Sequence, residues 1–180
     1  SPPSLPKCFG GNTIVMKQDG SLCMFKDLKI GDILKHDGKI VSFMKLSAHG
    51  EDIYRYGNIC VSGKHRIYTD KNLLTCIEVC KDKRFEKIGN EEEFLYCVET
   101  VNNTITIDNI IFTDWNDIDK KDYSVLKCVN NNNNDISIHN NFSGGFHKDT
   151  EIEMMDGHSI SIKDVEVNST LRYGERVIGK

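Results

Sequence analysis

The stretch CFGGNTIVMKQDG, residues 8–20, decides how this chain is interpreted. Cys8 follows a proline-rich lead, and the two glycines after Phe9 give the backbone freedom. Residues 13–16 are β-prone, and Asp19-Gly20 is typical of a hairpin turn. If any residue here performs covalent chemistry, we expect it to be Cys8. A catalytic thiol also needs a base and hydrogen-bond donors from elsewhere in the chain.

Composition bounds the classes of protein to consider. The 180 residues suffice for one good core and a second small module, with 38% hydrophobic and 28% charged residues. The net charge of −4 offers no electrostatic footprint for a nucleic-acid backbone, so we expect no nucleic-acid partner. No apolar run is long enough to span a membrane, and the first residues show no signal-peptide pattern.

The chain has seven cysteines, an odd number with no regular spacing. We therefore predict no disulfide framework, and we expect the cysteines other than Cys8 to be reduced and at least half-buried. Cys76 and Cys80 are spaced like a metal clip, but no second Cys/His pair lies at a zinc-like distance. We predict neither a metal nor an organic cofactor.

Short β-prone runs separated by turn signals fill most of the chain up to Phe112. No segment has a long helical period, and no strand–helix alternation occurs. The pattern predicts an all-β domain of short strands and hairpins. The predicted strands cover residues 13–16, 22–26, 39–46, 53–56, 58–61, 66–69, 94–100, 104–107 and 110–112, with a strand or short helix at 73–79 and a charged loop or helical turn at 81–93.

The remaining segments differ in composition. Residues 1–7 hold all three prolines and are predicted to be an extended leader. Residues 8–120 form the predicted main domain, and residues 121–144 are an Asn- and Gly-rich linker that includes a possible strand at 124–129. Residues 145–180 repeat the opening stretch without a gap. Thr150 falls on Thr13, Asp156-Gly157 on Asp19-Gly20, and Gly145 on Cys8, so the second copy lacks the thiol.

His65 is the best candidate for a proton shuttle, because imidazole titrates near neutral pH. It lies in Ser62-Gly63-Lys64-His65, where a hydroxyl and an imidazole three positions apart can point toward one place in a turn. Spacing alone leaves open a surface histidine in a turn.

Taken together, these motifs resemble a Hint domain, the autoprocessing module of hedgehog proteins, inteins and bacterial intein-like proteins. The resemblance spans about residues 8–115. Residues 8–20 and 28–32 are similar to the family's opening, Val61 to Thr69 to its Thr-x-x-His segment with Ser62 in place of Thr, and residues 95–112 to its closing strands. It implies a compact all-β Hint-like fold whose substrate is the chain's own N-terminal flank.

The resemblance also implies residue roles. Cys8 would attack the carbonyl of Lys7 in an N-to-S acyl shift, and the resulting thioester would be hydrolysed or passed to another nucleophile. His65 would protonate the departing nitrogen and Ser62 would hydrogen-bond at the scissile bond. Cys97 falls where inteins carry an Asp or Cys that helps a later step. Asp114 is a further candidate, with a turn Asp at a strand end as its alternative.

The closing segment departs from splicing inteins, which end in His-Asn before Cys, Ser or Thr. Here the last strand ends in Thr113-Asp114-Trp115, and the one His-Asn pair, His139-Asn140, lies downstream in Asn-rich sequence. The chain therefore resembles hedgehog-type, single-turnover N-terminal processing more than splicing. Two alternatives stay open: an inactive Hint-like scaffold that serves as an interaction module, and a cysteine hydrolase acting on other proteins.

Overall fold

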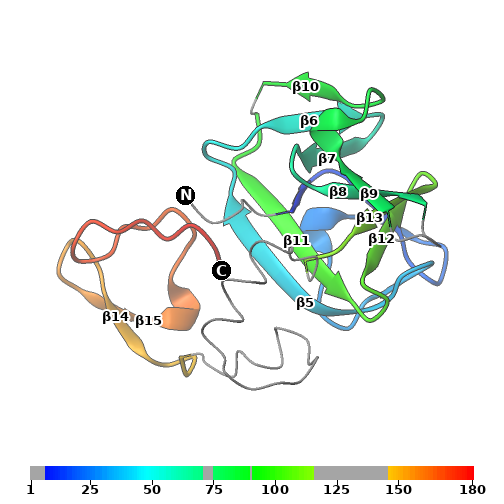
Figure 1. The fold of residues 1–180 in the computed structure, drawn as a ribbon. Helices are drawn as coiled ribbons and strands as arrows, with labels where there is room; N and C mark the ends of the chain where they lie inside the picture. The colour runs from blue at the N-terminus through cyan, green and yellow to red at the C-terminus, as the bar shows by residue number, and fades with distance from the viewer. Residues whose placement is uncertain (1–6, 71–74, 90, 116–145) are drawn as a thin grey trace, which may run out of the picture.

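The all-β prediction is confirmed by a computed structural model, which describes residues 7–70, 75–89, 91–115 and 146–180. These residues form strands and three short 3-10 turns, with no α-helix among them. Figure 1 shows the strands up to β13 in one body, with the β14–β15 hairpin beside it.

The larger sheet has seven strands in the order β10-β6-β7-β1-β11-β5-β4. Their bounds are β1 (Phe9–Gly10), β4 (Ile33–Leu34), β5 (Gly38–Ser47), β6 (Ile53–Tyr56), β7 (Ile59–Ser62), β10 (Glu86–Ile88) and β11 (Phe94–Thr100).

A second sheet has the order β12-β13-β8-β9, and the hairpins β2-β3 and β14-β15 are assigned as separate two-stranded sheets. The bounds are β2 (Ile14–Met16), β3 (Leu22–Met24), β8 (Arg66–Asp70), β9 (Thr75–Glu78), β12 (Thr104–Ile107), β13 (Ile110–Thr113), β14 (Glu151–Glu153) and β15 (Ser159–Ser161). The 3-10 turns are η1 (Phe25–Asp27), η2 (Val79–Lys81) and η3 (Ile162–Asp164).

The short strand β1 joins the two halves of the larger sheet, although the sequence pattern did not predict a strand there. Phe9 pairs with Tyr96 on β11 and with Val61 on β7, antiparallel on both sides. The next position has room only for glycine, because a Cβ at Gly10 would lie 2.8 Å from the Sγ of Cys60. A two-residue strand whose second residue is a glycine, with another glycine after it, has no strand pattern of its own, so only the neighbouring strands specify β1.

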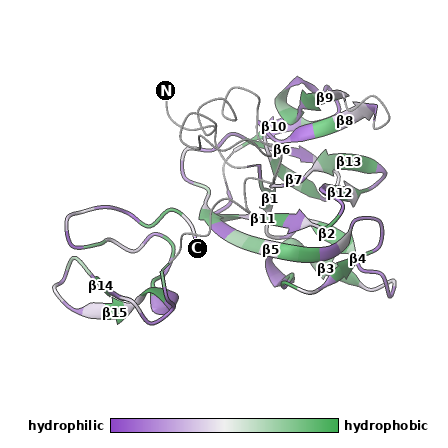
Figure 2. Ribbon diagram, turned by 60° about the horizontal axis from the view of Figure 1, so that its bottom comes forward, coloured by the Kyte–Doolittle hydropathy of each residue, from purple (hydrophilic) through white to green (hydrophobic). Residues whose placement is uncertain are grey.

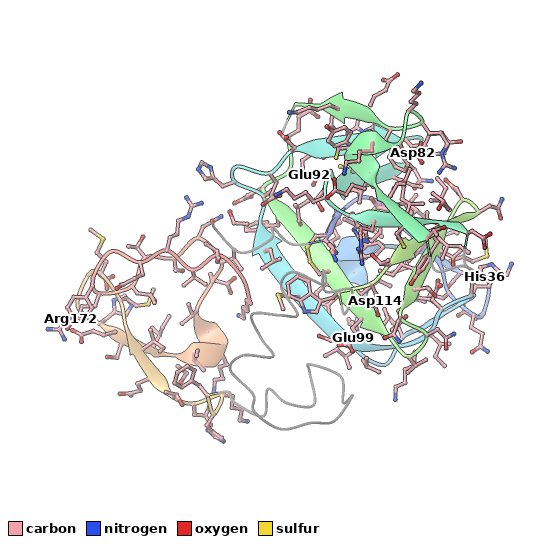
Figure 3. The ribbon with its side chains drawn as sticks, viewed as in Figure 1. His36, Asp82, Glu92, Glu99, Asp114 and Arg172 are labelled. Carbon is pink, nitrogen blue, oxygen red and sulfur yellow. A yellow bond between two sulfur atoms is a disulfide. The ribbon has the colours of Figure 1, made fainter. Side chains whose placement is uncertain are left out.

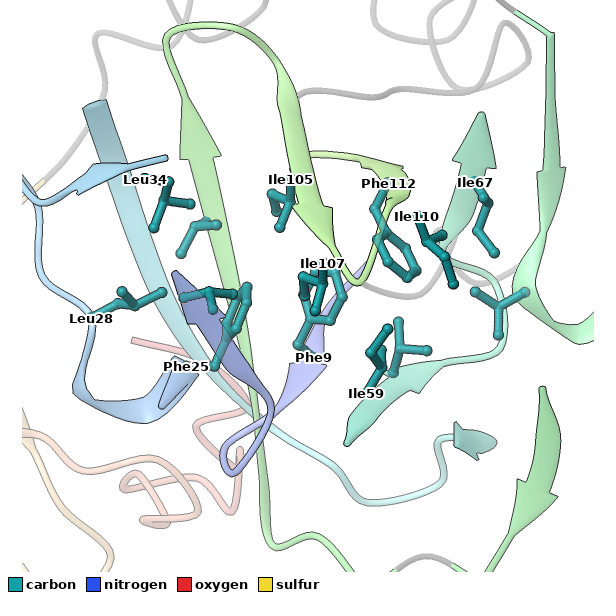
Figure 4. Close-up of a cluster of buried hydrophobic side chains, with 14 of the residues drawn as sticks. Phe9, Phe25, Leu28, Leu34, Ile59, Ile67, Ile105, Ile107, Ile110 and Phe112 are labelled. Atoms are coloured by element: carbon teal, nitrogen blue, oxygen red, sulfur yellow. The ribbon is translucent and has the colours of Figure 1, made fainter. Parts of the chain in front are cut away.

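Phe9 is also the centre of the hydrophobic core. Its ring lies 4.5 Å from that of Phe25 and 5.0 Å from that of Phe112, measured between centroids. Aliphatic side chains from both sheets and from the β2–β3 hairpin surround these rings (Figure 4). Burying an aromatic side chain of this kind contributes about 1.5–3 kcal/mol, so the core holds β1 between its neighbours.

The structure corrects one predicted element and decides between the two alternatives given for another. The charged segment 81–93 contains strand β10, which pairs with β6 along residues 53–55. An edge strand can expose charged side chains, so this segment lacks the alternation of apolar and polar residues that would indicate a strand. The ambiguous stretch 73–79 contains strand β9, and η2 begins at its last residue.

The internal repeat extends to the backbone hydrogen bonds. Adding 137 to residue numbers converts β2, β3 and η1 into β14, β15 and η3. The same shift converts the bond from Phe25 N–H to Thr13 O into that from Ile162 N–H to Thr150 O. It also converts the Lys26–Asn12 side-chain bond into the Lys163–Asp149 bond. Asn168 takes the positive φ of Gly31 (75° against 98°), which asparagine tolerates better than most residues.

The end of the second copy reaches the first sheet. Lys45 and Lys180 exchange two backbone hydrogen bonds of 2.9 Å, and Ser47 N–H donates to Ile178 O at 2.8 Å. Residues 178–180 thus pair with the edge of β5. Figure 2 shows the C-terminus beside the end of that strand. An otherwise open stretch of strand edge is paired in this way.

Asp37 provides a test of this packing, because its buried carboxylate accepts three hydrogen bonds of 2.8 Å. Its Oδ1 accepts from the Thr104 and Thr106 hydroxyls, and its Oδ2 accepts from Thr106 N–H. Asp37→Asn replaces one acceptor with a donor, so we expect the free energy of unfolding to fall by about 1–3 kcal/mol. Guanidinium denaturation measures this change. The exposed Asp27→Asn is the control, and equal stability of the two variants would contradict the account.

Candidate functional site

Cys8 directly precedes β1 and is fully buried. Its amide N–H donates to the Ser62 Oγ at 3.1 Å, and its carbonyl accepts from Ser62 N–H at 3.0 Å. The nitrogen of the Lys7–Cys8 peptide bond therefore contacts a side-chain hydroxyl. Lys7 itself is partly exposed, so this bond lies where the core meets the surface.

A tight turn at the end of β7 brings His65 back toward β1. His65 N–H donates to Ser62 O at 3.0 Å, which closes the turn, and Val79 N–H donates to His65 O at 2.8 Å. A side chain at Gly63 would clash, because a Cβ there would lie 2.6 Å from the Tyr54 ring. The Ser-x-x-His spacing thus corresponds to a buried turn, which excludes the surface-histidine interpretation.

The His65 ring is buried between Phe9 and Phe112, with centroid distances of 4.6 and 5.4 Å. Its Nε2 lies 2.7 Å from the carbonyl oxygen of Thr113. A carbonyl can only accept, so Nε2 carries the hydrogen. In the neutral ring the lone pair is therefore on Nδ1, which is buried.

Cys97 lies opposite Cys8 across the β1–β11 pair, and the structure joins the two in a disulfide with a Cα–Cα distance of 4.5 Å. The prediction that Cys97 is reduced and that no disulfide forms was wrong for this pair. The two cysteines are 89 positions apart, and only the pairing of β1 with β11, which the sequence did not predict, brings them together.

Asp114 lies just past the end of β13 and is buried. Its Oδ2 accepts from Thr100 N–H at 3.0 Å, and Trp115 N–H donates to Val98 O at 3.1 Å. Figure 3 labels Asp114 close to Glu99, the neighbour of Thr100. Asp114 therefore anchors the end of β13 to β11, next to the Thr113 carbonyl that holds His65.

The structure thus brings some of the predicted site residues into direct contact and connects others through neighbouring residues. Cys8 directly contacts both Ser62 and Cys97, and His65 lies in the turn that begins at Ser62. Asp114 is connected through its neighbour Thr113. The role of the Thr113 carbonyl could not be predicted from sequence, because a backbone acceptor has no residue-type signal. His139-Asn140 lies outside the described residues, as does the predicted linker.

Cys60 is a second buried thiol beside this site, and no sequence motif singled it out. Its backbone N–H and carbonyl both bond the hydroxyl of Thr13, at 2.9 and 3.1 Å. Burial, with the nearby Glu92 carboxylate, raises the pKa of the Cys60 thiol to about 12. A thiol with such a pKa stays protonated at neutral pH and is a poor nucleophile.

The described part of the chain has neither a metal-binding cluster nor a membrane-spanning helix. No three His, Cys, Asp or Glu side chains lie there in an arrangement that could hold a metal ion. No helix there has the length and apolar character needed to cross a membrane. Cys76 lies on β9 and Cys80 in η2, where the Cys80 thiol donates to Glu78 at 3.7 Å.

Comparison with known proteins shows similarity to solved structures in the backbone fold only. No family model matches the chain, and no curated protein matches its sequence. The crystal structure of the gp41-1 intein is similar at a TM-score of 0.47 and 13% identity, covering 61% of this chain and 100% of that one. A variant of that intein gives 0.45 and 12%, covering 60% and 99%. A bacterial intein-like domain from Clostridium thermocellum gives 0.45 and 15%, covering 62% and 99%.

The pKa of Cys60 generates a prediction on thiol reactivity. At pH 8.5 the native Cys60 thiol should react with iodoacetamide at least about a hundredfold more slowly than in the urea-unfolded chain, where its pKa is near 8.5. The native rate should rise toward pH 12, as the thiolate forms. Mass spectrometry with isotope-coded iodoacetamide measures both rates. Similar native and unfolded rates at pH 8.5 would refute the raised pKa.

Proposed function

We propose that this chain is a Hint-type autoprocessing domain that cleaves its own Lys7–Cys8 peptide bond. The observation that supports the proposal most directly is the 3.1 Å contact between the Cys8 amide nitrogen and the Ser62 hydroxyl, in the same turn as His65. The reacting thiol and amide belong to one residue, so the fold has only to activate a bond it already holds.

The proposed reaction begins with attack of the Cys8 sulfur on the Lys7 carbonyl carbon. A C–S bond forms, and a cyclic tetrahedral intermediate results. The C–N bond to Cys8 then breaks, leaving a thioester at Lys7 and a free amino group on Cys8. The proton lost by the thiol ends on that amino group, so the rearrangement is balanced without any cofactor.

His65 is the proposed proton carrier in this step. Because Nε2 carries the hydrogen bonded to the Thr113 carbonyl, Nδ1 is the nitrogen proposed to accept the thiol proton and deliver it to the leaving nitrogen. Amide nitrogen is a poor leaving group unless it is protonated, so this is where a general acid has its largest effect. Ser62 would keep the amide oriented during the transfer.

Asp114 and Cys97 have supporting roles in this proposal. Asp114 positions Thr113, and through it the His65 ring, rather than touching the reacting atoms. Cys97 in its reduced form is the thiol opposite the nucleophile on the neighbouring strand. A role for Cys97 in a later step stays a proposal.

The thioester is less stable than the amide, so something must capture it. Lys7 is partly exposed, which leaves a route for water, a thiol, an amine or a sterol hydroxyl to reach its carbonyl. The strand end Thr113-Asp114-Trp115 lacks the His-Asn of splicing inteins, so we propose cleavage at the N-terminal side only. We also propose that the autoprocessing domain spans residues 8–120 and that residues 145–180 begin a degenerate repeat of it.

One observation favours a second candidate, an inactive Hint-like scaffold that serves as an interaction module. The sulfur of Cys8 is bonded to Cys97 in this structure and cannot attack a carbonyl in that state. The two candidates differ in what the reduced chain does.

Release of the peptide 1–7 from the reduced chain tests the proposal. With dithiothreitol, which both reduces the disulfide and captures the thioester, mass spectrometry should find this peptide from the wild type and none from Cys8→Ala. His65→Ala should slow release by about a hundredfold or more, the usual effect of losing a general acid. Ser62→Ala should slow it more than Ser62→Thr, which keeps the hydroxyl.

The exposed His158 supplies the matched control, since His158→Ala should leave the rate unchanged. Circular dichroism and denaturation curves separate loss of chemistry from loss of folding in His65→Ala. An intact wild-type chain after full reduction, or release from Cys8→Ala at the wild-type rate, would overturn self-cleavage in favour of the scaffold.

A further inference from the structure

We propose that the Cys8–Cys97 disulfide is a redox lock on the self-cleavage proposed above, on which this inference rests. In the oxidised chain the bond between the two sulfurs removes the nucleophile. A reducing dithiol restores it and so starts the cleavage. Cys97 is thereby assigned a regulatory role, distinct from any part in the chemistry.

The sheet register places the two cysteines opposite one another. Phe9 pairs with Tyr96 and Gly10 with Leu95, so the antiparallel ladder continued by one residue sets Cys8 against Cys97. Their Cα–Cα distance of 4.5 Å is that of a directly opposed antiparallel pair and lies within the range of disulfides. The register of β1 and β11 thus places the two cysteines at a distance that a disulfide can bridge.

Other thiols near the site are poor substitutes for Cys97. Cys60 belongs to the same apolar cluster, but it is on β7 and bonded through its backbone to Thr13. Its high pKa keeps the thiol protonated, which disfavours attack on a disulfide. Among the described cysteines, Cys97 is therefore the oxidation partner that the fold places against Cys8.

The surroundings favour a lock that persists until it is reduced. Cys8 and Cys97 are both buried, in a cluster with Leu46, Ala48 and Leu95. Such burial limits access of other thiols to the bond, so exchange should be slow. Opening transfers two electrons and two protons from the external dithiol. The protein S–S bond becomes two thiols, and the dithiol becomes a disulfide.

The test separates reduction from capture of the thioester. Hydroxylamine captures thioesters but does not reduce disulfides, and a phosphine reduces disulfides without being a thiol. The air-oxidised wild type, after non-reducing peptide mapping has verified the Cys8–Cys97 link, is incubated with hydroxylamine with and without the phosphine. Release of peptide 1–7 should be at least about tenfold faster with the phosphine, since only the thiolate is a nucleophile.

Cys97→Ser removes the lock without removing Cys8. Its release rate with phosphine should equal its rate without, whatever the absolute rate, whereas Cys60→Ser should keep the wild-type dependence on phosphine. Cleavage of the linked, oxidised wild type at the reduced rate would overturn the lock while supporting the proposed function. Absence of the link in peptide mapping would also overturn the lock. No release from any sample would overturn the proposed function and with it the lock.

Discussion

The pairing of β1 with β7 on one side and β11 on the other is the constraint on which the site depends. Phe9, the first of its two residues, fills the centre of the core, and its neighbour Cys8 is fixed as a result. On the β7 side the Cys8 amide reaches Ser62, and on the β11 side its sulfur reaches Cys97. A strand too short to be stable alone is thus held by packing, and the packing determines the chemistry available to Cys8.

Burial of polar groups is the second requirement, because each needs a partner inside the protein. His65 bonds the Thr113 carbonyl, Asp114 bonds Thr100 N–H, and Asp37 bonds two threonines. These bonds connect the second sheet to the larger one. The bond to the Thr113 carbonyl also orients the His65 ring and places its hydrogen on Nε2.

Much of the fold could be predicted from sequence where side chains alternate over several residues. Strand β11 matches its predicted range, and the β2–β3 hairpin follows from Asp19-Gly20. The contact of Ser62 with Cys8 was anticipated, through the family resemblance rather than through spacing. Strand β1, strand β10 and the disulfide were not anticipated. Each is determined by a partner distant in sequence, and neither residue pattern nor cysteine spacing encodes such a partner.

The most direct test of the central claim follows the Lys7 carbonyl itself. With ¹³C at that carbonyl and ¹⁵N at Cys8, NMR reports whether the two atoms are still bonded. In the reduced chain treated with hydroxylamine, the account predicts that the carbon–nitrogen coupling disappears and that the ¹³C label moves into a Lys7 hydroxamate. A coupling that persists in full throughout the incubation, with the fold intact, would contradict it.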